Sequence, residues 1–566
     1  MSTQSSPPTS PAIQEWEHVG LSLSSVLDKY LLLSRQLVAK ALSENAHATD
    51  LIARIDCALQ SLRTVLSHQL DYVHSTLAET RNPLASAVYR LPQEILAEIF
   101  KFALCTRAHI DPDTSHPFKM ETALSHMLRD VRCLKFVCRS WKNTVLSPGL
   151  FWYFNLIHLT EIPAFRCIRA PKLGLEGFNK DLYLAAVMGD SSPEPLHYFF
   201  NSIRFHKVNA TSSFNFPIKA LIERILESGF PFTLAELSLY ESTCHDKMDK
   251  EDIDHVLTTT SPYWSSFCEL LKSLSVFRVR GAHFDWNHMT FSHTLVEVRL
   301  QDVMMGSDTE ELAEFLRVLA KAPNLRDLKL ISIQSSLDVD SLDIIGPEDK
   351  IQFPSLEVLF LENLAYNTLV TVTEYIAPGS HRLILYLTER AINDDGNADP
   401  DLDEVGVATL YPQLERLCVH TLVLSREWDD LSPEDLESLL RSLPELKSLK
   451  LNGWVLSKDE CYAISCSLLG QPGPATGVFP RLECLDLSCV HIMDQEWVKQ
   501  IVISHSIQKM ALGGYIHSGS VDQHQIQPLK WNEPIIDWLR VNVPNFTLLH
   551  KEVQPIEYSS FVWQLW

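Results

Sequence analysis

The chain has 566 residues, enough for several domains, and its 46% hydrophobic and 21% charged residues are typical of a globular protein with a core. Its 48 Lys and Arg against 71 Asp and Glu give a net charge of −23, so direct binding to DNA, RNA or an anionic membrane is not expected. No run reaches the ~20 apolar residues that span a bilayer, and no Lys or Arg precedes Lys29 to start a signal peptide. We therefore expect an intracellular protein, cytoplasmic and/or nuclear, whose 12 Cys are reduced.

The first eighty residues are predicted to form a tail followed by helix. Residues 1–20 begin with a Ser/Pro-rich stretch and are expected to be disordered, whereas residues 21–82 are rich in helix-forming residues. A heptad pattern in this helical segment defines a seam of Ala48, Ile52, Ile55, Leu59, Leu62, Leu66, Gln69 and Val73. The seam could form a coiled coil with a second copy, giving a homodimer, or pack within its own chain, and we favour packing within the chain.

Residues 88–155 are predicted to form a small all-helical unit. Pro92 suits the first position of a helix, where it removes no intrahelical hydrogen bond. One apolar face of this helix follows at helical spacing: Ile95, Leu96, Ile99, Phe100 and Ala103. After a polar loop at 106–126, a second helix aligns Val131, Leu134, Cys138, Trp141 and Val145. Because so small a unit has little core of its own, part of its apolar surface is expected to face a partner or the adjoining domain.

Residues 156–566 contain an internal repeat with the frame Pro-x-Leu-x-x-Leu-x-Leu. Its clearest copies begin at Pro323, Pro354, Pro444 and Pro480, with a near match at Pro412. Weaker copies occur at 234–239, 295–300 and 383–387, and successive copies from 295 onward are 27 to 36 residues apart. A repeat of this length predicts one short strand and a returning helix, such as 310–322 and 433–443, stacked into an α/β solenoid like that of leucine-rich-repeat proteins. The fold class expected for the whole chain is mixed α/β.

The region around Leu91–Trp152 resembles an F-box. The matching residues are Leu91-Pro92-Gln93-Glu94-Ile95-Leu96, Ile99-Phe100, Leu134, Val137-Cys138-Arg139-Ser140-Trp141, Val145-Leu146, Ser147-Pro148, Leu150 and Trp152. With a helix before it and repeats after it, the layout is similar to that of F-box proteins with irregular leucine-rich repeats, a type common in mushroom-forming (basidiomycete) fungi. In that family the box binds the Skp adaptor of a cullin–RING ubiquitin ligase, and the C-terminal domain captures a substrate.

The resemblance implies which residues contact the Skp adaptor. They are Leu91, Pro92, Ile95, Leu96, Ile99, Phe100, Leu134, Val137, Cys138 and Trp141. Two features depart from the family pattern. The loop between the box helices is longer than in a minimal F-box, and the Asn or Cys usual after the last strand Leu is replaced by Val303, Ile333, Leu364, Leu422 or Trp454. Without that polar residue in the turn, we expect an irregular solenoid.

The repeat frame also predicts a target-binding surface. If the leucines face the core, the residue between the last two faces outward, which places Arg299, Lys329, Phe360, Tyr386, Cys418, Lys450 and Asp486 in one row. Arg and aromatic residues are common interface anchors, so Arg299, Lys329, Phe360 and Tyr386 are the target-binding candidates. A solvated face with the target bound on loops is the alternative, and we weigh it slightly higher.

Four tryptophans near the C-terminus are predicted to cap the last repeat: Trp531, Trp538, Trp563 and Trp566. The alternative is that the tail folds back onto the concave face of the solenoid.

No motif in the chain proposes a reaction, a cofactor or a metal. The Cys pairs 133/138, 461/466 and 484/489 are five residues apart, not at zinc-knuckle spacing. An acidic stretch at 394–404 would place Ala391 and Leu402 where a calcium loop needs carboxylates. We therefore expect a non-catalytic substrate-recognition subunit of an SCF-type E3 ubiquitin ligase, as the resemblance implies. The alternatives are an interaction scaffold without a role in ubiquitylation and, less favoured, an unrecognised enzyme.

Overall fold

The computed structural model describes residues 10–44, 47–85, 88, 91–107, 120–146, 154–159, 182–188, 205–228, 233–242, 255–305, 309–335, 350–379, 381–392, 406–425, 431–465, 479–518, 525–551 and 563. The chain divides into two compact units, Met1–Pro92 and Gln93–Trp566, and each is described by itself. The beginning of the predicted tail (1–9), the aromatic end of the predicted box (147–153) and Trp566 lie outside the described residues.

The first unit is helical. It comprises α1 (Pro11–Ser43), α2 (Ala48–Ser61), a π-helical turn η1 (Leu62–Leu66) and α3 (Ser67–Ala85). The expected disordered tail over residues 1–20 is wrong from Pro11 onward, because proline is well suited to a helix start and helix-compatible residues follow it. None of the helices in the described ranges combines the length and apolar content needed to cross a membrane.

The heptad seam stays largely exposed within this unit. Helix α2 has no buried residue, and Ile52 and Leu59 are each 59% exposed. The π turn η1 adds a residue to one turn at Leu62–Leu66 and so displaces the seam that the heptads predict. Within the first unit the described residues therefore do not bury the seam, and both packing within the chain and pairing with a second copy stay predictions.

The second unit begins with three helices, α4 (Gln93–Arg107), α5 (Met120–Val137) and α6 (Arg139–Leu146). The expected loop at 106–126 is wrong at its end, because α5 already begins at Met120. The buried side chains of Met120, Leu124 and Met127 recur there at helical spacing. The single second helix expected from the sequence is divided at Cys138 into α5 and α6.

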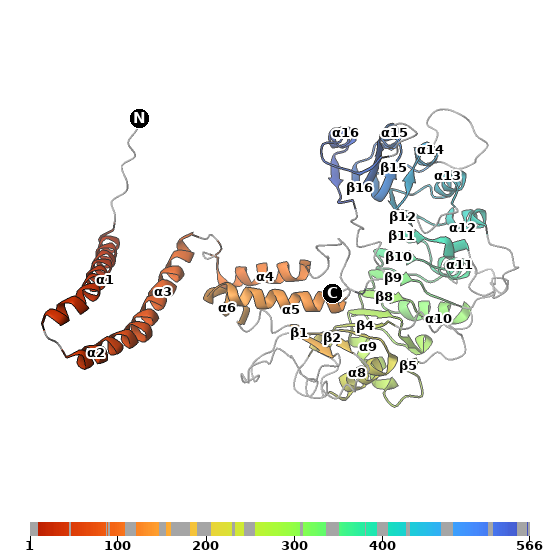
Figure 1. Cartoon of the computed structure of the whole chain (residues 1–566). Coiled ribbons are helices and arrows are strands. Elements are labelled where there is room, and N and C mark those ends of the chain that lie inside the picture. The colour runs from red at the N-terminus through yellow and green to blue at the C-terminus, as the bar shows by residue number, and fades with distance from the viewer. Residues whose placement is uncertain are drawn as a thin grey trace. The chain divides into compact units, whose positions relative to one another are not determined.

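The rest of the second unit is built on one long sheet (Figure 1). In spatial order its strands are β1 (Phe154–Leu159), β2 (Leu182–Met188), β3 (Phe205–Ser212), β4 (Glu236–Glu241), β6 (Val276–Arg280), β8 (Glu297–Gln301), β9 (Asp327–Ile331), β10 (Val358–Glu362), β11 (Arg382–Leu387), β12 (Val419–Ser425), β13 (Ser448–Asn452), β15 (Cys484–Ile492), β16 (Lys509–Ser518) and β17 (Gln525–Pro528). In addition, β14 (Val455–Leu456) pairs with β15, and β18 (Asn545–Leu548) pairs with β16. The pairing is parallel except between β16 and β17.

Helices return between the strands and lie against one face of this sheet (Figure 1). They are α8 (Asn215–Glu227), α9 (Trp264–Ser273), α10 (Thr309–Ala320), α11 (Tyr366–Tyr375), α12 (Tyr411–Leu414), α13 (Pro433–Arg441), α14 (Lys458–Ser465), α15 (Gln495–His505) and α16 (Pro534–Asn542), with short 3-10 turns η5 (Trp286–His288), η7 (Glu389–Ile392) and η8 (Val407–Thr409). The mixed α/β fold with N-terminal helices and a parallel sheet is thus confirmed.

The leucine frame marks the core side of the strands. Leu325, Leu328 and Leu330 of one copy are all at most 1% exposed, and their equivalents in the other clear copies are buried with them in one continuous cluster. Burying one such side chain contributes about 1.5–3 kcal/mol, so the repeated leucines are the main source of stability. The returning helices predicted at 310–322 and 433–443 are α10 and α13, within two residues at each end.

A left-handed residue ends the strand in most repeats. Positive φ angles occur at Gly281, Asp302, Ser332, Asn363, Gly453 and Cys489, each two residues after the last core-facing Leu or Val of its repeat frame; Cys489 lies within β15. Short polar residues and glycine tolerate this conformation best. Polar side chains link neighbouring turns: Asn363 Nδ2 donates to Ser332 Oγ at 2.7 Å, and Thr388 Oγ1 donates to Asn363 Oδ1 at 2.7 Å. The next residue, such as Val303 or Ile333, which stands where the family has Asn or Cys, is buried in the core.

A two-stranded ribbon of β5 (His255–Leu257) and β7 (His283–Phe284) gives the unit a pH-dependent group. Burial and, to a lesser extent, nearby His255 together lower the pKa of His283 from 6.5 to about 4. The backbone N–H of Met304 donates to His283 Nδ1 at 3.3 Å, which requires a neutral ring.

Acidification is therefore expected to destabilise the second unit between about pH 6.5 and pH 4. In this window the unfolded chain binds a proton at His283 that the folded chain excludes, so stability is complete above pH 6.5 and falls with pH by up to about 3 kcal/mol. Urea titrations of the wild type and His283→Gln across this range test the prediction. The variant should lose part of the slope, and an unchanged slope would contradict it. Burial also lowers the pKa of His381 and His505, so some dependence on pH remains.

Candidate binding surface on the open sheet face

The side of the sheet opposite α8–α16, here the open face, presents the outward residues of successive strands. Strand pairing aligns them in two rows. The first row runs through Arg278, Arg299, Lys329, Phe360, Ile384, Thr421, Ser448, Cys484 and Lys509. The second, two residues further along each strand, runs through Arg280, Gln301, Ile331, Glu362, Tyr386, Val423, Lys450 and Asp486.

The single row predicted from the repeat frame is therefore divided. Arg299, Lys329 and Phe360 share the first row as predicted, whereas Tyr386, Lys450 and Asp486 belong to the second. Cys418 lies before β12 and is in neither row. The cause lies between β10 and β11. β11 contains three alternating leucines, and it pairs Leu383 and Leu385, not Leu385 and Leu387, with Leu359 and Leu361 of β10.

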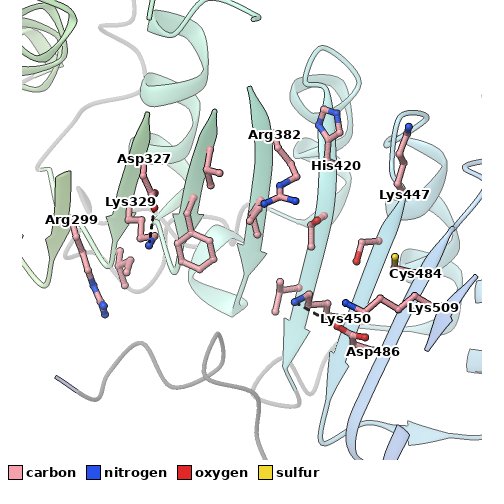
Figure 2. Close-up of a pocket in the computed structure, with 17 residues that line it drawn as sticks. Arg299, Asp327, Lys329, Arg382, His420, Lys447, Lys450, Cys484, Asp486 and Lys509 are labelled. Atoms are coloured by element: carbon pink, nitrogen blue, oxygen red, sulfur yellow. Dashed lines mark ion pairs between the residues drawn. The ribbon is translucent and has the colours of Figure 1, made fainter. Parts of the chain in front are cut away.

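A groove of about 640 Å³ follows the open face from β8 to β16. Three of the four target-binding candidates line the groove: Arg299, Lys329 and Phe360. Tyr386 does not, but its neighbours Ile384 and Val423 do. Six cationic side chains stand along it (Figure 2): Arg299, Lys329, Arg382, Lys447, Lys450 and Lys509. Only two of its lining residues, Asp327 and Asp486, are acidic.

The middle of the groove is apolar. Ile331, Phe360, Tyr386 and Val423 form a small buried cluster of their own, with Ile384 packed against it. It is separate from the leucine core on the other side of the sheet. A ligand crossing these strands would meet an apolar centre with cations on both sides.

The two acidic residues each neutralise one cation. Lys329 Nζ lies 3.1 Å from Asp327 Oδ2, and Lys450 Nζ lies 3.5 Å from Asp486 Oδ2 (Figure 2). Burial raises the pKa of Asp327, although Lys329 opposes this, and burial lowers the pKa of Arg299 to about 10. Arg299 is therefore still a cation at neutral pH.

Trp563 occupies a slot on the open face of β3, β4 and β8. The ring is 4% exposed, and its Nε1 donates to Asn209 Oδ1 at 2.8 Å. The Tyr240 ring lies 5.6 Å from it, and the Arg299 guanidinium lies 5.7 Å above it. Its prediction as a cap of the last repeat is wrong, whereas Trp538 does pack against the core at the last described repeat. Trp531 is 58% exposed, with Arg540 5.4 Å over its ring.

The residues predicted to bind the adaptor separate into two groups. Leu96 and Phe100 are buried in a cluster with α5, two residues of β2 and Trp563. Trp141 packs at the edge of this cluster, with its ring 4.8 Å from Phe100, and Leu134 is half-buried beside it. The other group is Leu91, Pro92, Ile95, Ile99 and Val137, which are exposed, while Cys138 is half-buried.

Helix α4 therefore has two apolar faces. Leu96, Phe100 and Leu104 form the buried face. Ile95, Ile99 and Phe102 follow the i, i+4, i+7 spacing of a second face and are 46–75% exposed. At the end of α5, Phe136 and Val137 are also exposed. Such a surface on a small helical unit is typical of a protein-binding site.

Sequence reasoning missed several residues of the open face. Arg382 and Lys509 alternate with buried strand residues, a signal that was available, but Lys509 lies outside any Pro-x-Leu frame. No sequence pattern indicates Asn209 and Tyr240, whose side chains contact Trp563. Among the described residues there is no cluster of three or more His, Cys, Asp or Glu that could hold a metal ion.

Comparison with known proteins adds little to this geometry. No protein-family model matches the chain, and no curated protein matches it. One similar solved structure is the leucine-rich repeat-containing protein LegL7 from Legionella pneumophila, with 12% identity and a TM-score of 0.29 over 64% of this chain and 97% of that one. At this level the likeness does not bear on function.

Proposed function

We propose that this chain is a non-catalytic protein-interaction scaffold that serves as the substrate-recognition subunit of an SCF-type E3 ubiquitin ligase. The F-box-like helices would bind a Skp-type adaptor and through it cullin, and the open face would hold a target protein. Tethering both to one chain raises the effective concentration of target lysines near the charged ubiquitin-conjugating enzyme. This activity would take place in the cytoplasm and/or nucleus.

The observation that carries the proposal is the second apolar face of α4. Ile95, Ile99 and Phe102 are exposed although Leu96 and Phe100 on the same helix supply its packing. These exposed residues lie within the segment whose sequence resembles an F-box. Leu96 and Trp141 support the helical unit from inside, so changing them would not separate loss of binding from loss of folding.

The test is a charge substitution on the exposed face. Ile95→Asp/Ile99→Asp should reduce binding of a purified Skp-type adaptor at least 30-fold, because removing one interface anchor typically costs about 2–4 kcal/mol. The matched control is Ile503→Asp/Val541→Asp, which changes two exposed apolar residues on α15 and α16. Binding constants from biolayer interferometry and co-purification of cullin are the readouts. Equal adaptor binding by both variants would contradict the assignment.

The alternative is a scaffold that does not direct ubiquitylation. The abundance of the target protein, not adaptor binding, distinguishes this alternative from a ligase subunit. If the chain is a ligase subunit, proteins bound to it should accumulate when Ile95→Asp/Ile99→Asp disables the adaptor face. For a scaffold, their abundance should not change.

A further inference from the structure

We propose that the groove on the open face binds an extended acidic peptide segment with an apolar residue at its centre. The inference names the ligand of the surface used in the proposed function and rests on that function for its biological setting. Its physical basis is the distribution of charge and apolar surface along the groove.

The groove is cationic in an acidic protein. The whole chain has a net charge of −23, yet the groove lining has six Lys and Arg against two Asp, an excess of four positive charges. His420 lies in the lining as well. Local charge opposite to that of the surrounding protein attracts a partner of complementary sign and excludes partners of the same sign.

Only some of the groove cations form ion pairs with carboxylates of the described residues. Lys329 and Lys450 are paired with Asp327 and Asp486, and Lys447 Nζ lies 3.7 Å from Glu483 at the rim. Arg382 and Lys509 are exposed, and no carboxylate among the described residues lies within 4.0 Å of either. Their charges are therefore open to an incoming anion.

The spacing suits a peptide. From β11, which holds Arg382, to β16, which holds Lys509, there are four strand steps, or roughly 19 Å at about 4.8 Å per step. An extended chain advances about 3.3 Å per residue, so about six residues would join the two cations. Of the apolar residues in the groove, Val423 on β12 lies between these two strands, Ile384 lies on β11 beside Arg382, and Phe360 lies one strand further out on β10. Acidic residues about six positions apart, with an apolar side chain beside them, match this arrangement.

Nucleic acid fits the groove less well. Its backbone would bring a phosphate to every nucleotide, and the paired Asp327 and Asp486 as well as the net charge of the chain would oppose it. A peptide can place its acidic residues at the open cations only.

The experiment uses the full chain and a fluorescein-labelled octapeptide with a Leu-Phe centre flanked by three Glu on each side. A second peptide with Gln in place of every Glu is the ligand control. Fluorescence anisotropy should show tighter binding of the Glu peptide, weakening with added salt. Arg382→Glu/Lys509→Glu should weaken it about 10- to 100-fold, because like charges then face each other. Lys219→Glu/Lys321→Glu makes the same change in net charge at exposed lysines in α8 and after α10, and should bind like the wild type.

Three results would overturn the inference: equal binding of the Glu and Gln peptides, equal binding by the two charge-reversed variants, or tighter binding of single-stranded RNA of the same length. Displacement by inorganic phosphate at concentrations where chloride has no effect would assign the groove to a free anion instead. Adaptor binding provides the separate readout. If Arg382→Glu/Lys509→Glu keeps the adaptor while the peptide never binds, only this inference fails. If the peptide binds while the wild type never binds the adaptor, the ligase role fails and the groove assignment stands.

Discussion

Replacing Trp563 with alanine is expected to lower the free energy of unfolding of the second unit by about 3–5 kcal/mol, the usual range for a buried tryptophan. The residue joins parts of the unit that are distant in sequence. Its ring packs with the buried residues of α4 and α5 and with Ala185 and Val187 of β2, and it hydrogen-bonds Asn209 across 354 positions. Removing it opens a cavity at the junction of the helices and the sheet.

Two further variants show which contact matters. Trp563→Phe keeps most of the ring but removes the hydrogen bond from Nε1 to Asn209, and should cost about 1–3 kcal/mol. Trp531→Ala is the matched control, because this exposed tryptophan should change stability by no more than about 0.5 kcal/mol. Urea midpoints of the full chain and amide hydrogen exchange in β3 and β4 are the measurements. Equal midpoints for Trp563→Ala and Trp531→Ala would show that the slot does not stabilise the fold.

The sequence predicted the strands whose inward residues are leucine. The frame identified β4, β8, β9, β10, β11, β13 and β15 because buried Leu residues at fixed spacing leave a clear pattern. The same core position is filled by Ala210 in β3, Val279 in β6 and Met510 in β16, and the frame does not reveal these strands well. Burial demands an apolar side chain of suitable volume, not a particular residue, so a pattern of one residue type detects only part of a solenoid.

The candidate site was less predictable than the fold. Outward residues of adjacent regular repeats, such as Arg299 and Lys329, align as the frame predicts. Beyond β10 the alignment depends on which two of the three alternating leucines of β11 pair with β10, a choice that is set by packing between strands and has no local sequence signal. The slot for Trp563 could not be predicted either, because it is formed by Asn209 and Tyr240, which are more than three hundred positions away in the sequence. Which apolar residues of α4 are buried could be determined only from the structure. Ile95 and Leu96 look equivalent in the sequence, but Leu96 is buried and Ile95 is exposed.

A buried ion pair at the edge of the open face gives the second large expected effect. Arg280 Nε lies 2.6 Å from Asp302 Oδ2, and the two side chains are only 4% and 7% exposed. The Arg280 guanidinium also lies 4.6 Å over the Tyr240 ring, which in turn contacts Trp563. Asp302 has a φ of 52°, which asparagine adopts readily, so Asp302→Asn removes the charge with little backbone strain.

Asp302→Asn is expected to destabilise the second unit by about 3 kcal/mol, because it removes the carboxylate that lies 2.6 Å from the buried guanidinium of Arg280. The matched control is Glu483→Gln, whose partner Lys447 is 3.7 Å away and whose side chains are more than half exposed. That change should cost less than about 1 kcal/mol. Salt should weaken the contribution of the exposed pair and leave that of the buried pair nearly unchanged, since burial limits screening. Urea unfolding at low and high salt measures both effects, and a loss for Asp302→Asn no greater than that for Glu483→Gln would show that the buried pair adds nothing to stability.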